Sequence, residues 1–305
     1  MKRLLLGAAL FTACTTTAMA QNIGVSVAYF DDNFLTSMRN AMQAEAESHG
    51  WNVQILDAQG DIGRQLSHTE SLAAQGVDAI IINPVDTAAT GMMTRVAVEN
   101  GIPLVYVNRE PEGNDLDHDN VAFVGSEQKV AGELQMEALA EMLGGEGRIA
   151  IMLGELSSSA THLRTEGVEE VAARYPGIEI IEKQPADYQR TNAIDLMNNW
   201  IVGGRQIDAI AANNDEMALG ALIAMRQSGI APDEILVGGI DATRDALDSL
   251  QRGELAASVF QDPIGQGGGA VKVAIALANG ETVESINMVP FQLVTRDNLE
   301  EFLAD

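Results

Sequence analysis

The sequence predicts an α/β protein of two domains, each built on a parallel β-sheet, with a ligand crevice between them. Short β-branched runs alternate with longer segments of helical period almost throughout, which is typical of parallel sheets covered by helices. The strand runs, such as "AIIIN" and "LVYVN", are continuously apolar, as expected where both faces of a sheet are buried. A polar stretch at 110–120 breaks the alternation, and a second series of strand–helix units follows it.

Each expected strand is an apolar run that ends at polar residues or glycine, and each expected helix carries apolar residues three or four positions apart. In the first half, strands are expected at 23–29, 53–57, 79–83 and 104–108, and helices at 34–48 and 62–74. In the second half, strands are expected at 149–153, 178–182, 209–212, 235–239 and 257–260, and helices at 132–143, 164–173 and 217–227.

The first twenty residues have the layout of a secretory signal peptide. The segment opens with "MKR", continues with an apolar run at 4–11 and ends in "AMA" at 18–20, which matches a cleavage site. Cys14, the only cysteine, offers an alternative as the anchored residue of a lipoprotein, but Phe11 fits the start of that signal poorly. We expect an exported chain that begins near Gln21 and has no disulfide.

Acidic residues dominate the chain, with 44 Asp and Glu against 18 Lys and Arg. Two of the basic residues lie in the leader, which leaves 16 and a formal net charge of −28 for the mature chain. Such a polyanion repels phosphate backbones, so nucleic acid is not an expected partner. Charges or glycine interrupt every later apolar run within about ten residues, so the mature chain is not expected to span a membrane.

Polar and aromatic side chains follow most of the expected strands. Ligands of parallel α/β sheets bind at the carboxyl edge, so these strand ends are the candidate site. Carboxylates and amides accept hydrogen bonds from hydroxyl groups, guanidinium groups donate to them, and aromatic rings pack on the C–H face of a sugar. The pattern therefore predicts a site for a neutral, hydroxyl-rich ligand. Its candidates are Asp32, Phe34, Asn108, Arg109, Tyr188, Asn214, Asp241 and Gln261, with Arg164 added if its helix begins at the crevice.

Several of these residues also have purely structural interpretations. In "NNDEMALGAL" at 213–222, we expect Asp215 to cap a helix that begins at Glu216, and Asn214 to contact the ligand. Asp241 is a candidate cap for the helix of "TRDALDSL", and Arg109 is a candidate partner of acidic loop residues. Their shared position at strand ends favours ligand binding for the set.

Three motifs that suggest other chemistry have simpler explanations. "GQGGGA" at 265–270 matches a dinucleotide fingerprint, but Pro263 and the missing acid at the end of a following strand favour close helix packing instead. His118 lies in an acidic stretch at 115–119, which we interpret as a surface loop and not as a cation site. The serines at 157–159 lack a nucleophile elbow. We expect no catalytic residue, no metal site and no cofactor.

Together these features resemble the periplasmic sugar-binding proteins of ABC importers, in particular the ribose-type cluster. The resemblance covers essentially the whole mature chain, and it is carried by "DDNFLTSMRNAMQ" (31–43), "IIINPVDTAA" (80–89), "VYVNRE" (105–110), "RTEGV" (164–168), "QPADYQR" (184–190), "NNDEMALGAL", "GGIDAT" (238–243) and "FQDPIGQG" (260–267). It implies a type I periplasmic binding fold, in which a three-segment hinge joins two doubly wound parallel-sheet lobes. The implied lobes are 22–125 with 262–290 and 126–261 with 291–305, after a signal peptide at 1–20.

The same resemblance places the family's binding pattern on Asp32, Phe34, Asn108, Arg109, Arg164, Tyr188, Asn214, Asp241 and Gln261. Ribose binders typically carry Asn, Phe, Asp and Phe at four positions where this chain has Asp32, Leu35, Asn108 and Ile240. These departures leave a roomier pocket with fewer aromatic rings and the same total charge. "FDDNFLTSMRN" and "YVNRE" are most similar to the inositol-binding branch.

The resemblance therefore implies a monomeric periplasmic protein that captures a neutral monosaccharide or cyclitol and delivers it to an ABC permease. The first choice of ligand is a ring polyol such as myo-inositol, followed by ribose or a hexose, and a chemoreceptor partner is compatible with this role. Two other classes are considered. A sugar-sensing repressor is disfavoured by the export signal and the acidity. A carbohydrate-active enzyme would use paired acids such as Asp32 and Asp241.

Overall fold

The computed structural model describes residues 21–303. The expected signal peptide at 1–20, which includes Cys14, lies outside the described residues, as do residues 304–305. Within the described part of the chain, no helix is long and apolar enough to cross a membrane.

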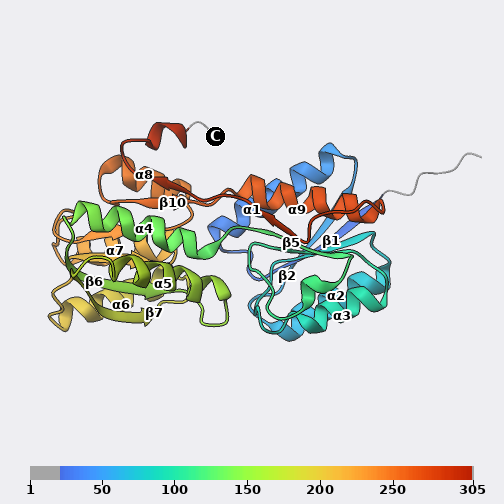
Figure 1. The fold of residues 1–305 in the computed structure, drawn as a ribbon, viewed down its shortest axis with the longest axis horizontal. Helices are drawn as coiled ribbons and strands as arrows, with labels where there is room; N and C mark the ends of the chain where they lie inside the picture. The colour runs from blue at the N-terminus through green and yellow to red at the C-terminus, as the bar shows by residue number, and fades with distance from the viewer. Residues whose placement is uncertain (1–20, 304–305) are drawn as a thin grey trace, which may run out of the picture.

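Two α/β lobes lie side by side (Figure 1). The larger sheet has six parallel strands in the spatial order β11 (Ile286–Met288), β5 (Val121–Gly125), β4 (Leu104–Val107), β3 (Ala79–Ile82), β1 (Asn22–Val27) and β2 (Asn52–Asp57). The smaller sheet has four parallel strands in the order β7 (Gly177–Pro185), β6 (Glu146–Leu153), β8 (Ala209–Ala212) and β9 (Leu236–Gly238). Beside it, β10 (Ser258–Phe260) and β12 (Gln292–Val294) form an antiparallel pair, and isolated bridges connect this pair to the sheet.

Helices cover both faces of each sheet, as the continuously apolar strands predicted. Around the larger sheet, α1 (Asn33–Ser48) and α9 (Pro263–Ala278) lie on one face, and α2 (Ile62–Gln75) and α3 (Gly91–Glu99) lie on the other (Figure 1). Around the smaller sheet, α4 (Gln128–Met142) and α5 (Ser159–Ala172) lie on one face, and α6 (Arg190–Val202), α7 (Asp215–Gln227) and α8 (Arg244–Arg252) lie on the other. Two single-turn 3-10 helices complete the elements, η1 (Asp115–Asp117) and η2 (Leu299–Glu301).

The core of the larger lobe follows from the two-residue period of its strands. In β3, Ile81 packs with α1 and α9, whereas Ile80 and Ile82 pack on the opposite face with α2 and α3. All three are fully buried, and burying a side chain of this size stabilises the fold by roughly 1.5–3 kcal/mol.

The glycine-rich segment at 265–270 lies in α9 and packs closely against α1, as the sequence indicated. A Cβ atom at Gly267 would lie 2.4 Å from the carbonyl oxygen of Met38, which only glycine avoids without a backbone shift. The small residues therefore serve helix packing.

The chain passes between the two sheets three times, which forms the expected three-segment hinge. The passages follow β5, β10 and β11, and they lead into α4, α9 and β12 respectively. Each lobe is therefore assembled from segments that are distant in the sequence.

The acidic stretch at 115–119 begins with the 3-10 turn η1. The Asp115 side chain is buried and accepts a hydrogen bond from the Thr90 hydroxyl at 2.6 Å. Among the described residues, no group of three His, Cys, Asp or Glu side chains is arranged to hold a metal ion.

Candidate ligand-binding site

A small cavity of about 360 Å³, partly open to solvent, lies between the lobes. All nine residues that the sequence singled out line it, so their separate strand ends do meet at one place. The lining residues are Asp32, Phe34, Leu35, Asn108, Arg109, Ser158, Ala160, Arg164, Tyr188, Asn214, Asp241 and Gln261.

The loop after β1 supplies the first wall of the cavity. Asp32 is the N-cap of α1, and its Oδ1 accepts a hydrogen bond from the Leu35 amide at 2.7 Å. Phe34 and Leu35 in the first helical turn are buried and face the cavity. Burial raises the pKa of the Asp32 carboxyl above its ordinary value, although the hydrogen bond from Leu35 opposes the shift.

Asn108 follows β4 and has a left-handed backbone, with φ of 68°. Its Oδ1 accepts a hydrogen bond from the Asn83 amide at 3.1 Å, and its Nδ2 donates to Gln266 Oε1 at 3.1 Å. The side chain is therefore held in place by Asn83, which directly follows β3, and by Gln266 on α9.

Arg109 is buried next to Asn108 and binds both lobes. Its Nη1 donates to the carbonyl oxygens of Pro84 at 3.2 Å and Val85 at 3.3 Å, and it lies 3.0 Å from Glu155 Oε2. Its guanidinium carbon lies 5.8 Å from the centre of the Tyr188 ring. The expected pairing with an acid is present, and the same side chain also lines the cavity.

Arg164 meets the condition set by the sequence, because α5 begins beside the cavity at Ser159. Its Nε donates to Gln128 Oε1 at 2.8 Å, its Nη1 to the Asn213 carbonyl at 2.6 Å and its Nη2 to Gln261 Oε1 at 2.7 Å. These three bonds leave two of its five N–H groups for other partners.

Besides Asn108, two more lining residues sit on turns with positive φ, a conformation that side-chain-bearing residues rarely adopt. Tyr188 has φ of 59°, and its hydroxyl lies 2.8 Å from the Thr161 hydroxyl. Asp241 has φ of 122° and is followed by Ala242 with φ of 51°. Strain of this kind is common where a fold holds side chains at a binding site.

Asp241 does not cap α8, contrary to one interpretation of the sequence. The cap is Thr243, two residues later, because the turn at Asp241 is not yet helical. The Asp241 carboxylate is instead buried in the cavity wall, with Oδ1 at 3.9 Å from Arg164 Nη1. Burial raises the pKa of Asp241 well above its ordinary value, and the positive charge of Arg164 opposes the rise.

The expected capping role of Asp215 is wrong, because α7 begins at Asp215, one residue earlier than predicted. Asn214 is the N-cap, and its Oδ1 accepts a hydrogen bond from the Met217 amide at 3.0 Å. The fully buried Asp215 carboxylate turns away from α7 and accepts hydrogen bonds from the Ser258 hydroxyl at 2.7 Å and the Thr243 amide at 2.7 Å. Asn214 thus combines a structural role with a place in the cavity wall.

Three lining residues were not among the sequence candidates, namely Leu35, Ser158 and Ala160. Leu35 was noticeable only because aromatic residues are usual at that position in ribose binders. Ser158 and Ala160 carry no local signal, because their burial depends on how the start of α5 meets the other lobe.

The lobes also contact each other beside the cavity without using its lining residues. The Asn33 side chain donates from Nδ2 to Glu216 Oε1 at 2.7 Å, and the Thr87 amide donates to the Ser157 carbonyl at 3.2 Å. With the ion pair between Arg109 and Glu155, these contacts hold the lobes closed over the cavity.

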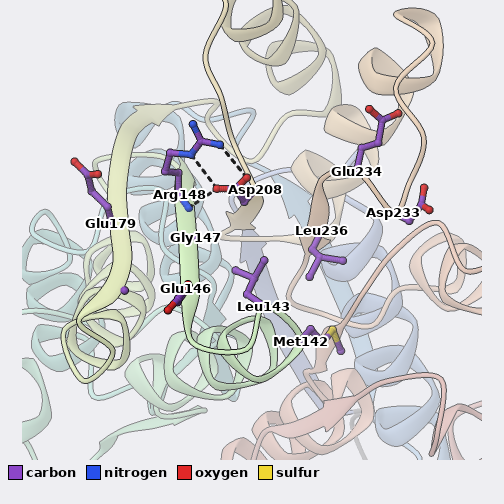
Figure 2. A pocket seen from close by; sticks show the side chains of 11 residues that line it. Met142, Leu143, Glu146, Gly147, Arg148, Glu179, Asp208, Asp233, Glu234 and Leu236 are labelled. Atoms are coloured by element: carbon purple, nitrogen blue, oxygen red, sulfur yellow. Dashed lines mark hydrogen bonds and ion pairs between the residues drawn. The ribbon is translucent and has the colours of Figure 1, made fainter.

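A larger hollow of about 1090 Å³ lies at the opposite edge of the smaller sheet, where the strands begin (Figure 2). Its lining includes Arg148, Asp208 and several other acidic residues. Arg148 donates from Nε and Nη2 to the two oxygens of Asp208 at 2.9 and 3.1 Å, as the dashed lines in Figure 2 show. None of the residues predicted for the site lies there.

Known proteins of this architecture match the chain along most of its length. Residues 23–282 match the family model of the periplasmic binding protein domain. A Rhizobium meliloti protein named for binding rhizopine is 46% identical over 99% of both chains. The ribose import binding protein of Bacillus subtilis is 35% identical over 90% of this chain and 87% of its own.

Solved structures agree with these matches. An ABC-transporter solute-binding protein from Bacillus halodurans with bound myo-inositol is 43% identical, with a TM-score of 0.89 over 95% of this chain and 99% of that chain. The Caulobacter myo-inositol-binding protein, bound to myo-inositol, is 28% identical, with a TM-score of 0.85 over 93% of this chain and 96% of that chain. The chain therefore belongs to the periplasmic binding protein family, as a sugar-binding protein of ABC transporters.

Proposed function

We propose that this protein captures a neutral ring polyol, with myo-inositol as the first choice and ribose or a hexose next. The observation that carries the proposal is the set of polar groups that meet at the cavity, which comprises two carboxyl groups, two guanidinium groups and three side-chain amides. Carboxyl, amide and guanidinium groups together pair with hydroxyl groups, which both donate and accept hydrogen bonds. The cavity is small and lies between lobes that contact each other, which suits a ligand of a single ring.

The nine predicted residues divide the recognition of such a ring among them. Asp32 and Asp241 accept hydrogen bonds from ligand hydroxyl groups, and Arg109 and Arg164 donate to them. The amides of Asn108, Asn214 and Gln261 complete the polar contacts, and Phe34 and Tyr188 pack on the C–H faces of the ring. A polyol that lacks one of these hydroxyls leaves a buried partner unpaired and binds more weakly.

The ligand is captured by closure of the lobes. Because the proposed contacts come from both lobes, the ligand binds the closed form better than an open one and shifts the population toward it. The closed form is then recognised by the permease of an ABC importer, and a chemoreceptor is a compatible second partner. We divide the lobes at 22–125 with 262–290 and 126–261 with 291–305.

The proposed setting is the periplasm, which a monomeric chain reaches after removal of a signal peptide at 1–20. Named relatives of the chain include import and periplasmic binding proteins, which supports this setting. We further propose that the protein is not an enzyme, because these relatives are solute-binding proteins. A carbohydrate-active enzyme that uses Asp32 and Asp241 is the alternative, and formation of a product from bound ligand would establish it.

Isothermal titration calorimetry against a panel of myo-inositol, ribose, galactose, xylitol and rhizopine tests the ligand. Relatives of the chain are named for the last four of these or for their import, and myo-inositol is bound in solved neighbours. We expect tight binding of myo-inositol, with weaker or no binding of ribose. Tight binding of ribose with none of myo-inositol would overturn the first choice. Mass spectrometry of ligand released by denaturing the purified protein provides an independent identification.

A further inference from the structure

The start of α5 differs from the starts of the other helices that border the cavity. Asp32 at α1 and Asn214 at α7 each accept a hydrogen bond from an amide in the first turn of their helix. Ser158 is the N-cap of α5 and has the extended backbone that a cap requires, with φ of −105° and ψ of 125°. Its hydroxyl nevertheless makes no capping bond.

The Ser158 side chain is fully buried and lines the cavity. Several buried side-chain atoms in the described part of the chain lack a hydrogen-bond partner, and Ser158 Oγ is the one among them that belongs to a lining residue. A buried hydroxyl without a partner is unfavourable, because it has lost its hydrogen bonds to water without replacing them. A serine in this position is therefore unfavourable unless another molecule satisfies it.

The surroundings hold Ser158 in this place. The carbonyl of Ser157 accepts a hydrogen bond from the Thr87 amide at 3.2 Å, and the Ser159 amide donates to the Thr87 hydroxyl at 3.2 Å. Both neighbours are thus tied to the other lobe, which fixes the backbone on either side of Ser158. The side chain can rotate, but its backbone cannot move away from the cavity while the lobes are closed.

The first turn of α5 also favours an electronegative atom at this point. Ala160, in that turn, lines the cavity next to Ser158, and helix amides at this end carry a partial positive charge. The Thr161 hydroxyl is already occupied, because it donates to the Glu155 carbonyl at 2.7 Å and lies 2.8 Å from the Tyr188 hydroxyl. Ser158 is therefore the uncommitted hydroxyl at the start of the helix.

We propose that Ser158 is a specificity-determining ligand contact, whose hydroxyl binds one hydroxyl group of the polyol at the start of α5. A ligand hydroxyl suits this position because it can both accept from and donate to Ser158 Oγ. The inference rests on the proposed function, since it assigns a tenth polar or aromatic contact to the same cavity. It adds a requirement for an oxygen at one particular position of the ring.

The test compares Ser158→Ala with Ser157→Ala, measured by calorimetry with myo-inositol and with its monodeoxy analogues. Ser157 is the matched control, because it precedes Ser158 in the same loop and is exposed. We expect Ser158→Ala to weaken myo-inositol binding about tenfold, as loss of one buried hydrogen bond implies, and Ser157→Ala to leave it unchanged. One deoxy analogue should bind wild type weakly and should lose no further affinity in Ser158→Ala.

The thermal midpoint of the ligand-free variant separates this role from a structural one. Because Ser158 Oγ makes no bond within the described residues and is unfavourable when buried without a partner, Ser158→Ala should keep or raise the midpoint of wild type and should not lower it. An unchanged affinity for myo-inositol in Ser158→Ala would overturn the inference. An equal loss for every deoxy analogue would also overturn it, because that result indicates a general distortion of the helix start.

The measurements on wild type distinguish a failure of the inference from a failure of the proposed function. If wild type binds none of the polyols, the proposed function is wrong, and the inference about Ser158 is wrong with it. If wild type binds ribose and not myo-inositol, the same two variants are compared with ribose and its deoxy analogues, with the same expected pattern. If wild type binds and Ser158→Ala behaves as Ser157→Ala does, the inference alone is wrong.

Discussion

The two edges of the smaller sheet both carry a pairing of arginine with aspartate, but in opposite environments. At the amino edge, Arg148 and Asp208 line a hollow about three times larger than the cavity, and their side chains are 39% and 36% exposed. At the carboxyl edge, the side chains of Arg164 and Asp241 are 5% and 7% exposed and lie 3.9 Å apart. Exposed pairs contribute about 0–1 kcal/mol, whereas buried polar groups need partners. Burial and unused hydrogen-bonding capacity, and not volume, therefore distinguish the proposed binding site from the amino-edge hollow.

The largest expected effect on ligand affinity comes from replacing an arginine at the cavity, and the comparison is the same replacement at the amino-edge hollow. Arg109→Ala should weaken binding of the preferred ligand at least tenfold, because it removes a buried donor of charge-assisted hydrogen bonds. Arg148→Ala should change affinity less than twofold, because its side chain is exposed and paired away from the cavity. Calorimetry of both variants checks the comparison, with circular dichroism to confirm folding. Equal losses in the two variants would show that the contrast between the edges has no functional meaning.

A smaller effect is expected at Asn214, where capping and ligand contact are separable. Asn214→Ala should lower the free energy of unfolding by about 1 kcal/mol, because the Met217 amide loses its acceptor, and should also weaken binding severalfold. Asn214→Asp should restore the cap, because aspartate caps equally well, although it loses the bond that Nδ2 donates to the Tyr188 carbonyl at 3.4 Å. It should still weaken binding, because it removes the amide donor.

Asp61→Ala provides the control for these variants, because Asp61 caps α2 away from the cavity. Urea unfolding should show a loss of about 1 kcal/mol in this control, and calorimetry should show unchanged affinity. If Asn214→Asp binds as tightly as wild type, Asn214 is a cap alone.

The smallest expected effect concerns Asp215, which is buried beneath the turn that carries Asp241. Burial raises the pKa of Asp215 to about 7, against the opposing hydrogen bonds from Ser258 and Thr243. The folded protein therefore retains a proton that the unfolded chain releases near pH 4. The contribution of this group to the free energy of unfolding is largest below pH 4 and is lost progressively as the pH rises to about 7.

Asp215→Asn should remove this component, so its stability should fall less steeply than that of wild type between pH 5 and pH 7. Urea unfolding at several pH values measures both slopes, with Asp233→Asn as a control because Asp233 is an exposed acid at the amino-edge hollow. Parallel slopes for wild type and Asp215→Asn would contradict the assignment.

The sequence correctly predicted which polar residues follow the strands and meet at the cavity. It was wrong about features that depend on one or a few residues, such as short strands and helix caps. Long apolar runs identified nine strands, but β5 (Val121–Gly125) was missed because it directly follows an irregular loop. β11 and β12 were missed because they are short and mostly not buried, so they lack a continuous apolar run. Helix starts are the least reliable part of a sequence prediction: the helices expected from 132 and 164 begin earlier, at Gln128 and Ser159. The same uncertainty is why the cap was assigned to Asp215 and not to Asn214.

The carboxyl-edge rule brought nine residues to one cavity, because it depends on topology and not on local detail. The rule could not find Ser158, whose burial arises only when α5 meets a loop of the other lobe. It also could not foresee that Asn108 is held by Asn83 and Gln266, since these partners come from distant segments. Such contacts become visible only in three dimensions.

The contacts between the lobes that involve Asn33 and Thr87 use no atom of the cavity lining. They stabilise the closed shape whether or not a polyol is present, so they set the fraction of empty molecules that is already closed. The measured affinity equals the intrinsic affinity of the closed form multiplied by that fraction. Residues outside the cavity lining thus set the sugar concentration at which the protein is half-saturated. Changing them would raise or lower that concentration without changing which sugar the cavity prefers.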